Sequence, residues 1–181
     1  MDKLPPYAEL MAMSHFSFQM AASSPQDMVQ RAYDLGYSAI ALADLCSVAG
    51  VVRAHVRAKE LGMAFIPASS FAWSDGWRLV ALPQDKLGWG QLCEFITLAR
   101  GSGQSDALSE GLPRVEKAHV RMPSWQYAAA HLQHCVHLLI PPRLALDETC
   151  MAYPHQLSPA LSAIAQRITQ WCALAGATPV R

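Results

Sequence analysis

The sequence predicts an α/β protein in which helices cover a mainly parallel sheet. Segments with strand and helix patterns alternate along the chain, and glycines follow several of the helical segments. The apolar run at 37–42 (YSAIAL) lacks the alternation of a half-exposed strand and is typical of a buried parallel one. This order of elements fits both an open doubly wound sheet and part of a (βα) barrel.

The first half of the chain contains the clearest local signals. Residues 7–13 (YAELMAM) predict a short strand. Ser24 followed by Pro25 and Asp27 is typical of a helix start, and Gly36 is placed to end that helix. Three further elements are then expected: a strand at 37–42, a helix at 48–61 closed by Gly62, and a strand at 63–66.

The second half continues the alternation with longer connections. A turn at 74–76 precedes a strand at 77–82, and helices are expected at 89–100, 123–132 and 158–175, with a strand at 134–140. Residues 101–113 are rich in Gly, Ser and Asp and predict a flexible loop. The sequence stops soon after Gly176, as a further strand would begin, so we expect a partial domain over 1–181.

Composition excludes several classes of protein. Hydrophobic residues make up 52% of the 181 residues, which is enough for a substantial core and argues against general disorder. The formal net charge of +0 gives no support to a strongly basic nucleic-acid clamp. No apolar run reaches the roughly 18–20 residues that span a bilayer, and the first residues do not resemble a secretory signal.

Motif searches give little that indicates chemistry. The five cysteines (46, 93, 135, 150 and 172) form no C-x-x-C pair, so we expect reduced, buried thiols in a cytoplasmic protein. The sequence contains no dinucleotide-binding glycine motif, no phosphate-binding loop and no G-x-S-x-G elbow.

Three stretches together carry a family resemblance: YAELMAMSHFSF at 7–18, LGYSAIALADLCSVAGVVRAHVRAKELGM at 35–63, and RLVALPQDKLGWGQLCEFITLAR at 78–100. This set resembles the N-terminal polymerase-and-histidinol-phosphatase (PHP) domain of bacterial DNA polymerase III alpha-like subunits, in particular the error-prone branch. The resemblance implies a distorted (βα) barrel that is incomplete at its C-terminus. It also implies a cluster of divalent ions held by His, Asp and Glu side chains at the strand ends.

The sequence departs from that ligand pattern. The two histidine positions of the first motif carry Met11 and Met13, and the Asp-His pair of the second is Asp44 and Leu45. The glutamate position of the third motif falls on Ser70. Thioethers are poor ligands for hard or borderline cations, and one carboxylate cannot hold a cluster. We therefore predict a degenerate site with no catalytic, cofactor-binding or metal-binding residues.

Each remaining candidate has a structural interpretation that we favour. Asp44 is expected to cap the turn before the helix at 48–61, and Met11 and Met13 to fill the vacated pocket as core. His15 is expected to be a partly exposed loop residue. His131, His134 and His137 are not expected to share an ion, because His134 and His137 would point to opposite faces of a strand. Trp73, Trp77 and Trp89 are expected in the core or in a subunit contact.

The resemblance implies a function in the context of a longer chain. The family is that of DNA-directed DNA polymerases (nucleotidyltransferases) of replication and translesion repair. Its reaction uses Mg²⁺ held by a polymerase core that is absent from these 181 residues. We predict that the segment is inactive alone, packs against that core and meets DNA only through the parent chain, in the cytoplasm and away from membranes.

Two alternatives remain open at this point. One is a free-standing metal-dependent phosphoesterase, and the other is a non-catalytic interaction module. Separately from these alternatives, a barrel that lacks its last strands would expose an unpaired strand edge and apolar helix faces, which predicts low solubility or self-association of the isolated chain.

Overall fold

A computed structural model describes residues 6–101, 122–142 and 158–176. Its strands form one five-stranded sheet in the order β1-β2-β3-β4-β5. The strands are β1 (Ala8–Ala12), β2 (Ala39–Leu45), β3 (Ala64–Ala72), β4 (Arg78–Pro83) and β5 (Cys135–Ile140). The helices are α1 (Pro25–Asp34), α2 (Val51–Leu61), α3 (Lys86–Gly101), α4 (Trp125–His131) and α6 (Ser158–Ala175). Apart from Gly101, which ends α3, the predicted loop at 101–113 lies outside the described residues.

The helix ends follow from the local sequence. The Ser24 hydroxyl accepts a hydrogen bond from the Asp27 amide and Pro25 occupies the first turn of α1, which confirms the predicted start. Gly62 ends α2 with a left-handed backbone (φ 67°), a conformation that glycine adopts without strain.

The prediction of a mainly parallel sheet is wrong for the second half. β1, β2 and β3 are parallel, whereas β3–β4 and β4–β5 are antiparallel pairs. A tight turn explains the change: the Trp73 amide donates to the Trp77 carbonyl, and Gly76 has φ 86°. So short a connection makes a hairpin, because a parallel crossover needs about a dozen residues or more.

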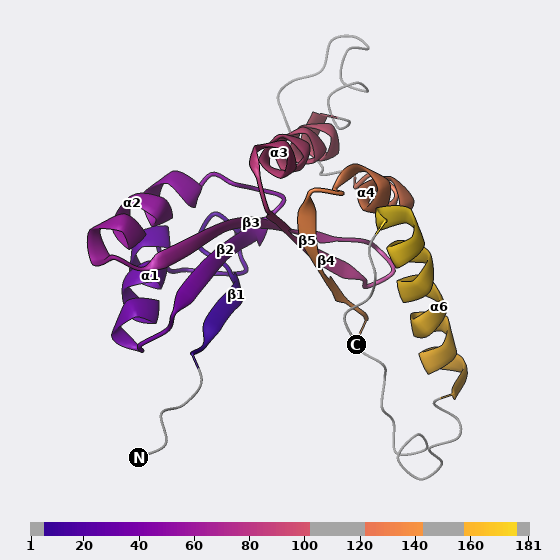
Figure 1. The fold of residues 1–181 in the computed structure, drawn as a ribbon, viewed down its shortest axis with the longest axis horizontal. Helices are drawn as coiled ribbons and strands as arrows, with labels where there is room; N and C mark the ends of the chain where they lie inside the picture. The colour runs from indigo at the N-terminus through magenta and orange to yellow at the C-terminus, as the bar shows by residue number, and fades with distance from the viewer. Residues whose placement is uncertain (1–5, 102–121, 143–157, 177–181) are drawn as a thin grey trace.

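The helices cover one face of the sheet. On β2, Ile40 and Leu42 pack under α1 and α2, while Ala41 and Ala43 face the opposite side. The same alternation on β4 directs Leu79 towards α3 and α4. Figure 1 shows α1 and α2 beside β1–β3, with α3, α4 and α6 around β4 and β5.

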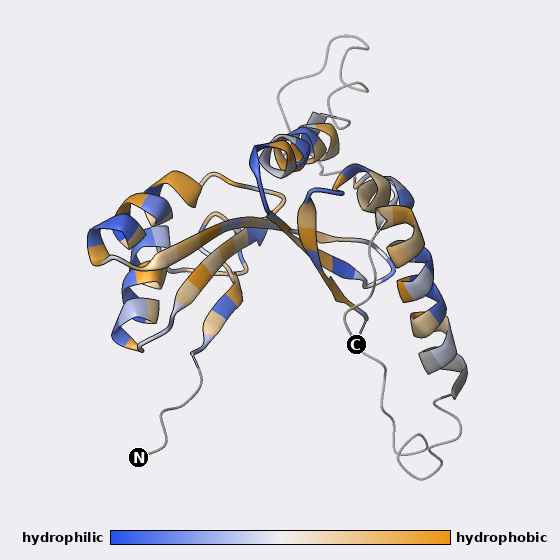
Figure 2. Cartoon of the chain, viewed as in Figure 1, coloured by the Kyte–Doolittle hydropathy of each residue, from blue (hydrophilic) through white to orange (hydrophobic). Residues whose placement is uncertain are grey.

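The face of the sheet opposite the described helices is also apolar. Figure 2 shows the strands mainly in hydrophobic colours, with the hydrophilic colours concentrated on helices and turns. Side chains of all five strands meet on this face: Leu10, Ala41, Ala43, Ile66, Ala68, Val80, Leu82, Leu138 and Ile140. An open sheet with helices outside and an apolar inner face is the arrangement expected of an incomplete barrel, as the sequence predicted.

Candidate functional site

Buried polar side chains gather where the parallel strands end. In the described part of the chain, the buried polar residues are Ser14, Ser17, Asp44, Ser47, Ser69 and Ser70. They come from the segment after β1, the end of β2 with the turn that follows it, and the second half of β3. The carboxyl ends of parallel strands share one edge of a sheet, so these segments converge there.

The Asp44 carboxylate is at the centre of this network and is 1% exposed. Its Oδ1 accepts from the Ser14 amide at 2.8 Å and from the Ser17 hydroxyl at 2.7 Å. Its Oδ2 accepts from the Ser14 hydroxyl at 2.8 Å. The two serine oxygens in turn accept from backbone amides, Ser14 from Phe16 and Ser17 from Leu45. Both hydroxyl protons are thereby directed at the carboxylate.

Asp44 therefore has a different role from the predicted cap before the second helix. α2 begins at Val51, and its N-cap residue, Gly50, makes no side-chain capping bond. The amide that Asp44 binds belongs to Ser14, in the segment that joins β1 to α1. The carboxylate thus ties that segment to the end of β2, because its donors come from residues 27 and 30 positions earlier in the chain.

A second set of bonds holds the turn after β2. The Ser69 hydroxyl donates to the Asp44 carbonyl and accepts from the Ser47 amide, each at 3.0 Å. Cys46 has a left-handed backbone (φ 46°), and its carbonyl accepts from Arg100 Nε at 2.7 Å. Burial raises the pKa of the Cys46 thiol despite the nearby guanidinium, so this thiol is a poor nucleophile.

The other family ligand positions are Met11, Met13, Leu45 and Ser70, and none of them adds a carboxylate or an imidazole to this network. Met11 is 46% exposed and lies beside Glu9 and α1, so the prediction that it fills the core is wrong. The register between β1 and β2 shifts between Glu9 and Ala12, and the Met11 amide there donates to the Glu9 carboxylate. Met13 and Leu45 are half-buried, and Ser70 is 3% exposed.

These residues do not fit a divalent metal cluster. The described residues contain no group of three or more His, Cys, Asp or Glu side chains placed to hold a metal ion. Each Asp44 carboxylate oxygen already accepts from protein donors, and Leu45 has no ligand atom. The donor set that remains, one occupied carboxylate with hydroxyls, is too poor for two or three cations.

The histidines occupy separate environments. His15 is exposed with its ring against Phe16, in agreement with its expected loop position. His134 pairs with Asp85 at 3.0 Å, and His131 lies 3.5 Å from Glu94. The Gly88 amide and His134 together lower the pKa of Asp85.

His137 is held in its neutral form by two partners. Its Nε2 lies 2.8 Å from the Leu132 carbonyl, an acceptor only, so this nitrogen carries the proton. Its Nδ1 accepts from Trp171 Nε1 at 3.1 Å. Burial lowers the pKa of His137 despite the bond to Leu132. The ring is therefore a satisfied core group.

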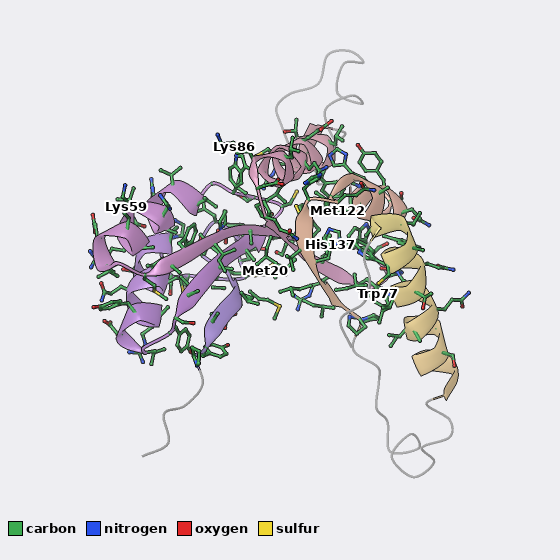
Figure 3. All side chains as sticks on the ribbon, in the orientation of Figure 1. Met20, Lys59, Trp77, Lys86, Met122 and His137 are labelled. Atoms are coloured by element: carbon green, nitrogen blue, oxygen red, sulfur yellow. The ribbon has the colours of Figure 1, made fainter. Side chains whose placement is uncertain are left out.

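A tryptophan cluster joins α6 to the sheet, a contact that sequence reasoning missed. The Arg167 guanidinium lies 4.8 Å from both the Trp77 and Trp125 rings, and it also pairs with Asp75. Trp171 stacks on Trp125. Figure 3 shows Trp77 and His137 between the β4–β5 strands and α6. Trp77 is buried and Trp73 half-buried in this region, as the core prediction required, whereas Trp89 is 36% exposed.

The prediction of buried cysteines is confirmed for two of the four that the structure describes. Cys46 and Cys135 are buried, Cys93 and Cys172 are half-buried, and all four are free thiols. Burial, with a smaller contribution from the Asp85 charge, raises the pKa of Cys135 to about 11. Cys150 lies outside the described residues.

The half-barrel with polar groups at its strand ends is that of a PHP domain. The PHP domain family model matches residues 9–173, and the chain belongs to this family. A solved structure from Bifidobacterium adolescentis, provisionally assigned as a metal-dependent phosphoesterase, has a similar fold. Its TM-score is 0.53 at 14% identity, over 75% of this chain and 66% of that one.

Curated relatives identify the branch of the family. The chain is 43% identical over 143 residues to an error-prone DNA polymerase of Methylococcus capsulatus, covering 79% of this chain. It is 46% identical over 149 residues to one of Ralstonia nicotianae, covering 76% of this chain. The chain spans only 12% and 13% of the lengths of these relatives, so its homologues are parts of larger polymerase chains. None of the described helices has the length and apolar character needed to cross a membrane.

Proposed function

We propose that this chain is the PHP segment of an error-prone DNA polymerase and that its role there is structural. In this proposal it packs against a polymerase core and supports it, and the core holds Mg²⁺ and carries out nucleotide transfer. DNA contacts, damage-tolerant synthesis and repair, and the cytoplasmic location belong to the complete polymerase. The identity to two error-prone DNA polymerases supports this assignment.

The observation that carries the structural role is the state of Asp44. Three of the roughly four acceptor positions of this carboxylate are taken by Ser14 and Ser17, and the side chain is 1% exposed, which leaves little room for a cation. The network fixes the segment after β1 against β2 by protein–protein hydrogen bonds. In our proposal these hydrogen bonds hold the strand ends together, as metal ions do in a complete PHP site.

Metal analysis combined with a phosphodiesterase assay tests whether the site around Asp44 binds metal ions and hydrolyses phosphate esters. The purified chain is equilibrated with Zn²⁺ or Mn²⁺, desalted and assayed for bound metal and for hydrolysis of bis(p-nitrophenyl) phosphate. We expect far less than one metal per chain and no turnover above buffer. Stoichiometric metal together with turnover, both lost in Asp44→Asn, would instead support the phosphoesterase alternative that the fold similarity suggests.

The reading frame tests the polymerase assignment separately. The DNA downstream of codon 181 should encode a polymerase core, either in frame or after a frameshift. Unrelated sequence at that place would favour an independent interaction module and would contradict the proposed parent chain.

A further inference from the structure

A pocket of about 290 Å³ opens at the carboxyl ends of β2 and β3. Its lining includes Phe16, Leu45, Ala72, Arg100 and Met122. Leu45 stands at one of the degenerate ligand positions, so the place where the family binds cations is here lined by apolar side chains. Figure 3 labels Met122, where the chain re-enters the described structure just before α4.

A buried hydroxyl without a partner lies on the same face of the sheet. Ser70 is the register partner of Leu45 and stands two positions before Ala72, so it shares their side of β3. Its hydroxyl is buried and has no hydrogen-bond partner among the described residues. Buried hydroxyls are normally paired, so Ser70 is an exception close to the pocket, although it is not one of the residues that line it.

The charge around the pocket is positive. Arg100 uses Nε to bond the Cys46 carbonyl, and the Arg53 guanidinium lies 5.8 Å from the centre of the Phe16 ring. In the described part of the chain, neither arginine forms an ion pair with a carboxylate. The nearby Asp44 carboxylate is enclosed by its serine donors. Within the described residues, the pocket is apolar apart from Ser17 and one guanidinium without an ion pair, that of Arg100, so it is complementary to an apolar group next to an anion.

We propose that this pocket binds a peptide segment of a protein partner in which an apolar side chain stands next to an acidic residue. The apolar side chain enters between Leu45, Ala72 and Met122, and the carboxylate pairs with Arg100. This inference goes beyond the structural role proposed above, because the pocket and its charge belong to the chain itself and do not depend on the parent polymerase.

Nucleic acid is a poorer match to the same features. A phosphate backbone is held by several cations and amides along a track, whereas this pocket offers one guanidinium at an apolar cavity. The volume of about 290 Å³ suits one or two side chains better than a stacked nucleotide.

The test uses the full chain labelled with ¹⁵N and the peptide acetyl-Gly-Asp-Leu-Phe-Gly-amide at millimolar concentration. We expect shifts at the Arg100 Nε–H and at the amides of Leu45 and Cys46. A matched peptide with Asn in place of Asp should bind about tenfold more weakly, because the charge pairing with the guanidinium is lost. The same fall is expected for Arg100→Gln with the acidic peptide.

Two further variants separate the pocket from general charge effects. Ala72→Leu should fill the cavity and abolish binding while Arg100 remains in place. Arg31→Gln removes an exposed arginine that lines a different pocket on α1, and it should leave binding unchanged.

Three results would overturn the proposal. They are absence of shifts at millimolar peptide, equal binding of the Asp and Asn peptides, and binding that survives Ala72→Leu. Stronger shifts of the same amides by oligothymidylate than by the peptide would also overturn it, in favour of a nucleic-acid site. None of these outcomes depends on the metal content of the chain, so failure here is distinguishable from failure of the structural role.

Discussion

Replacing Asp44 tests the central network most directly. Asp44→Ala removes an acceptor of three hydrogen bonds and leaves the Ser14 amide and two hydroxyls unpaired in a buried site. Hydrogen bonds to a charged group contribute about 1.5–3 kcal/mol each and do not add fully, so we expect a loss of about 4 kcal/mol. This is a large part of the roughly 5–15 kcal/mol that stabilises a typical domain.

Asp44→Asn separates shape from charge. The Asn carbonyl oxygen can accept the bonds that Oδ1 now takes from the Ser14 amide and the Ser17 hydroxyl. Its amide nitrogen would face the Ser14 hydroxyl as a second donor, so one bond must be rearranged. We expect a loss of about 2 kcal/mol, between the wild type and Asp44→Ala.

Urea unfolding followed by tryptophan fluorescence measures these differences. Asp34→Asn is the matched control: Asp34 is an exposed carboxylate on α1 that accepts one bond from Gln30, and its replacement should change stability by less than about 0.5 kcal/mol. If Asp44→Ala unfolds within about 1 kcal/mol of the wild type, the network does not hold the segment after β1. If Zn²⁺ stabilises the wild type but not Asp44→Asn, Asp44 is a ligand and the reasoning fails.

Three further predictions concern packing, pH and the contact of α6. Gly88→Ala would place a Cβ 2.2 Å from the His134 carbonyl oxygen and should cost more than about 3 kcal/mol in urea unfolding, whereas Gly90→Ala, with open space around it, should be neutral or stabilising. The pKa of His137 is lowered in the folded state, because burial favours the neutral ring. The neutral ring therefore contributes to the free energy of unfolding above the unfolded-state pKa of about 6.5, and this contribution is lost as the pH falls below that value. Between pH 7 and pH 5 the wild type should therefore lose more stability than His137→Gln, and a parallel loss in both would contradict the buried neutral ring. Arg167→Met should keep the apolar contact but remove the cation between two indoles, which should change the near-UV circular dichroism and lower the melting temperature, and an unchanged spectrum would show that the stack does not form.

Local signals predicted most of the elements, because their causes lie within a few residues. The Ser24 cap and the glycine at 62 specify the ends of α1 and α2 without any distant contact. The end of β3 could not be predicted in this way. Its second half contains Ser69 and Ser70, which are polar in sequence but buried in the fold. The partners of the Ser69 hydroxyl are the Asp44 carbonyl in β2 and the Ser47 amide in the turn after it, both more than twenty residues away.

The site was predictable in position but not in detail. The resemblance placed Asp44 at the degenerate centre, but its donors lie in the segment after β1, and no pattern in the sequence indicates that pairing. The exposure of Met11 depends on a register shift in β1, which period-two alternation does not predict. The contact of α6 through Arg167 joins residues about ninety positions apart, with Asp75 as its partner. Each of these features arises from tertiary contacts rather than from local propensity.

The cost of burying a charge explains how the carboxylate of Asp44 is kept at a family ligand position while Leu45 beside it is apolar. A buried carboxylate is costly unless several donors surround it, so Asp44 is compatible with a metal-free site only together with Ser14 and Ser17. Leu45 has no such requirement, because apolar side chains are stabilised by the pocket walls themselves. Hydrogen bonds within the protein therefore hold the strand ends around Asp44, while the pocket beside it is lined mainly by apolar side chains. In our proposal this arrangement gives a corner of the fold held by hydrogen bonds around Asp44, next to a pocket that binds a protein partner.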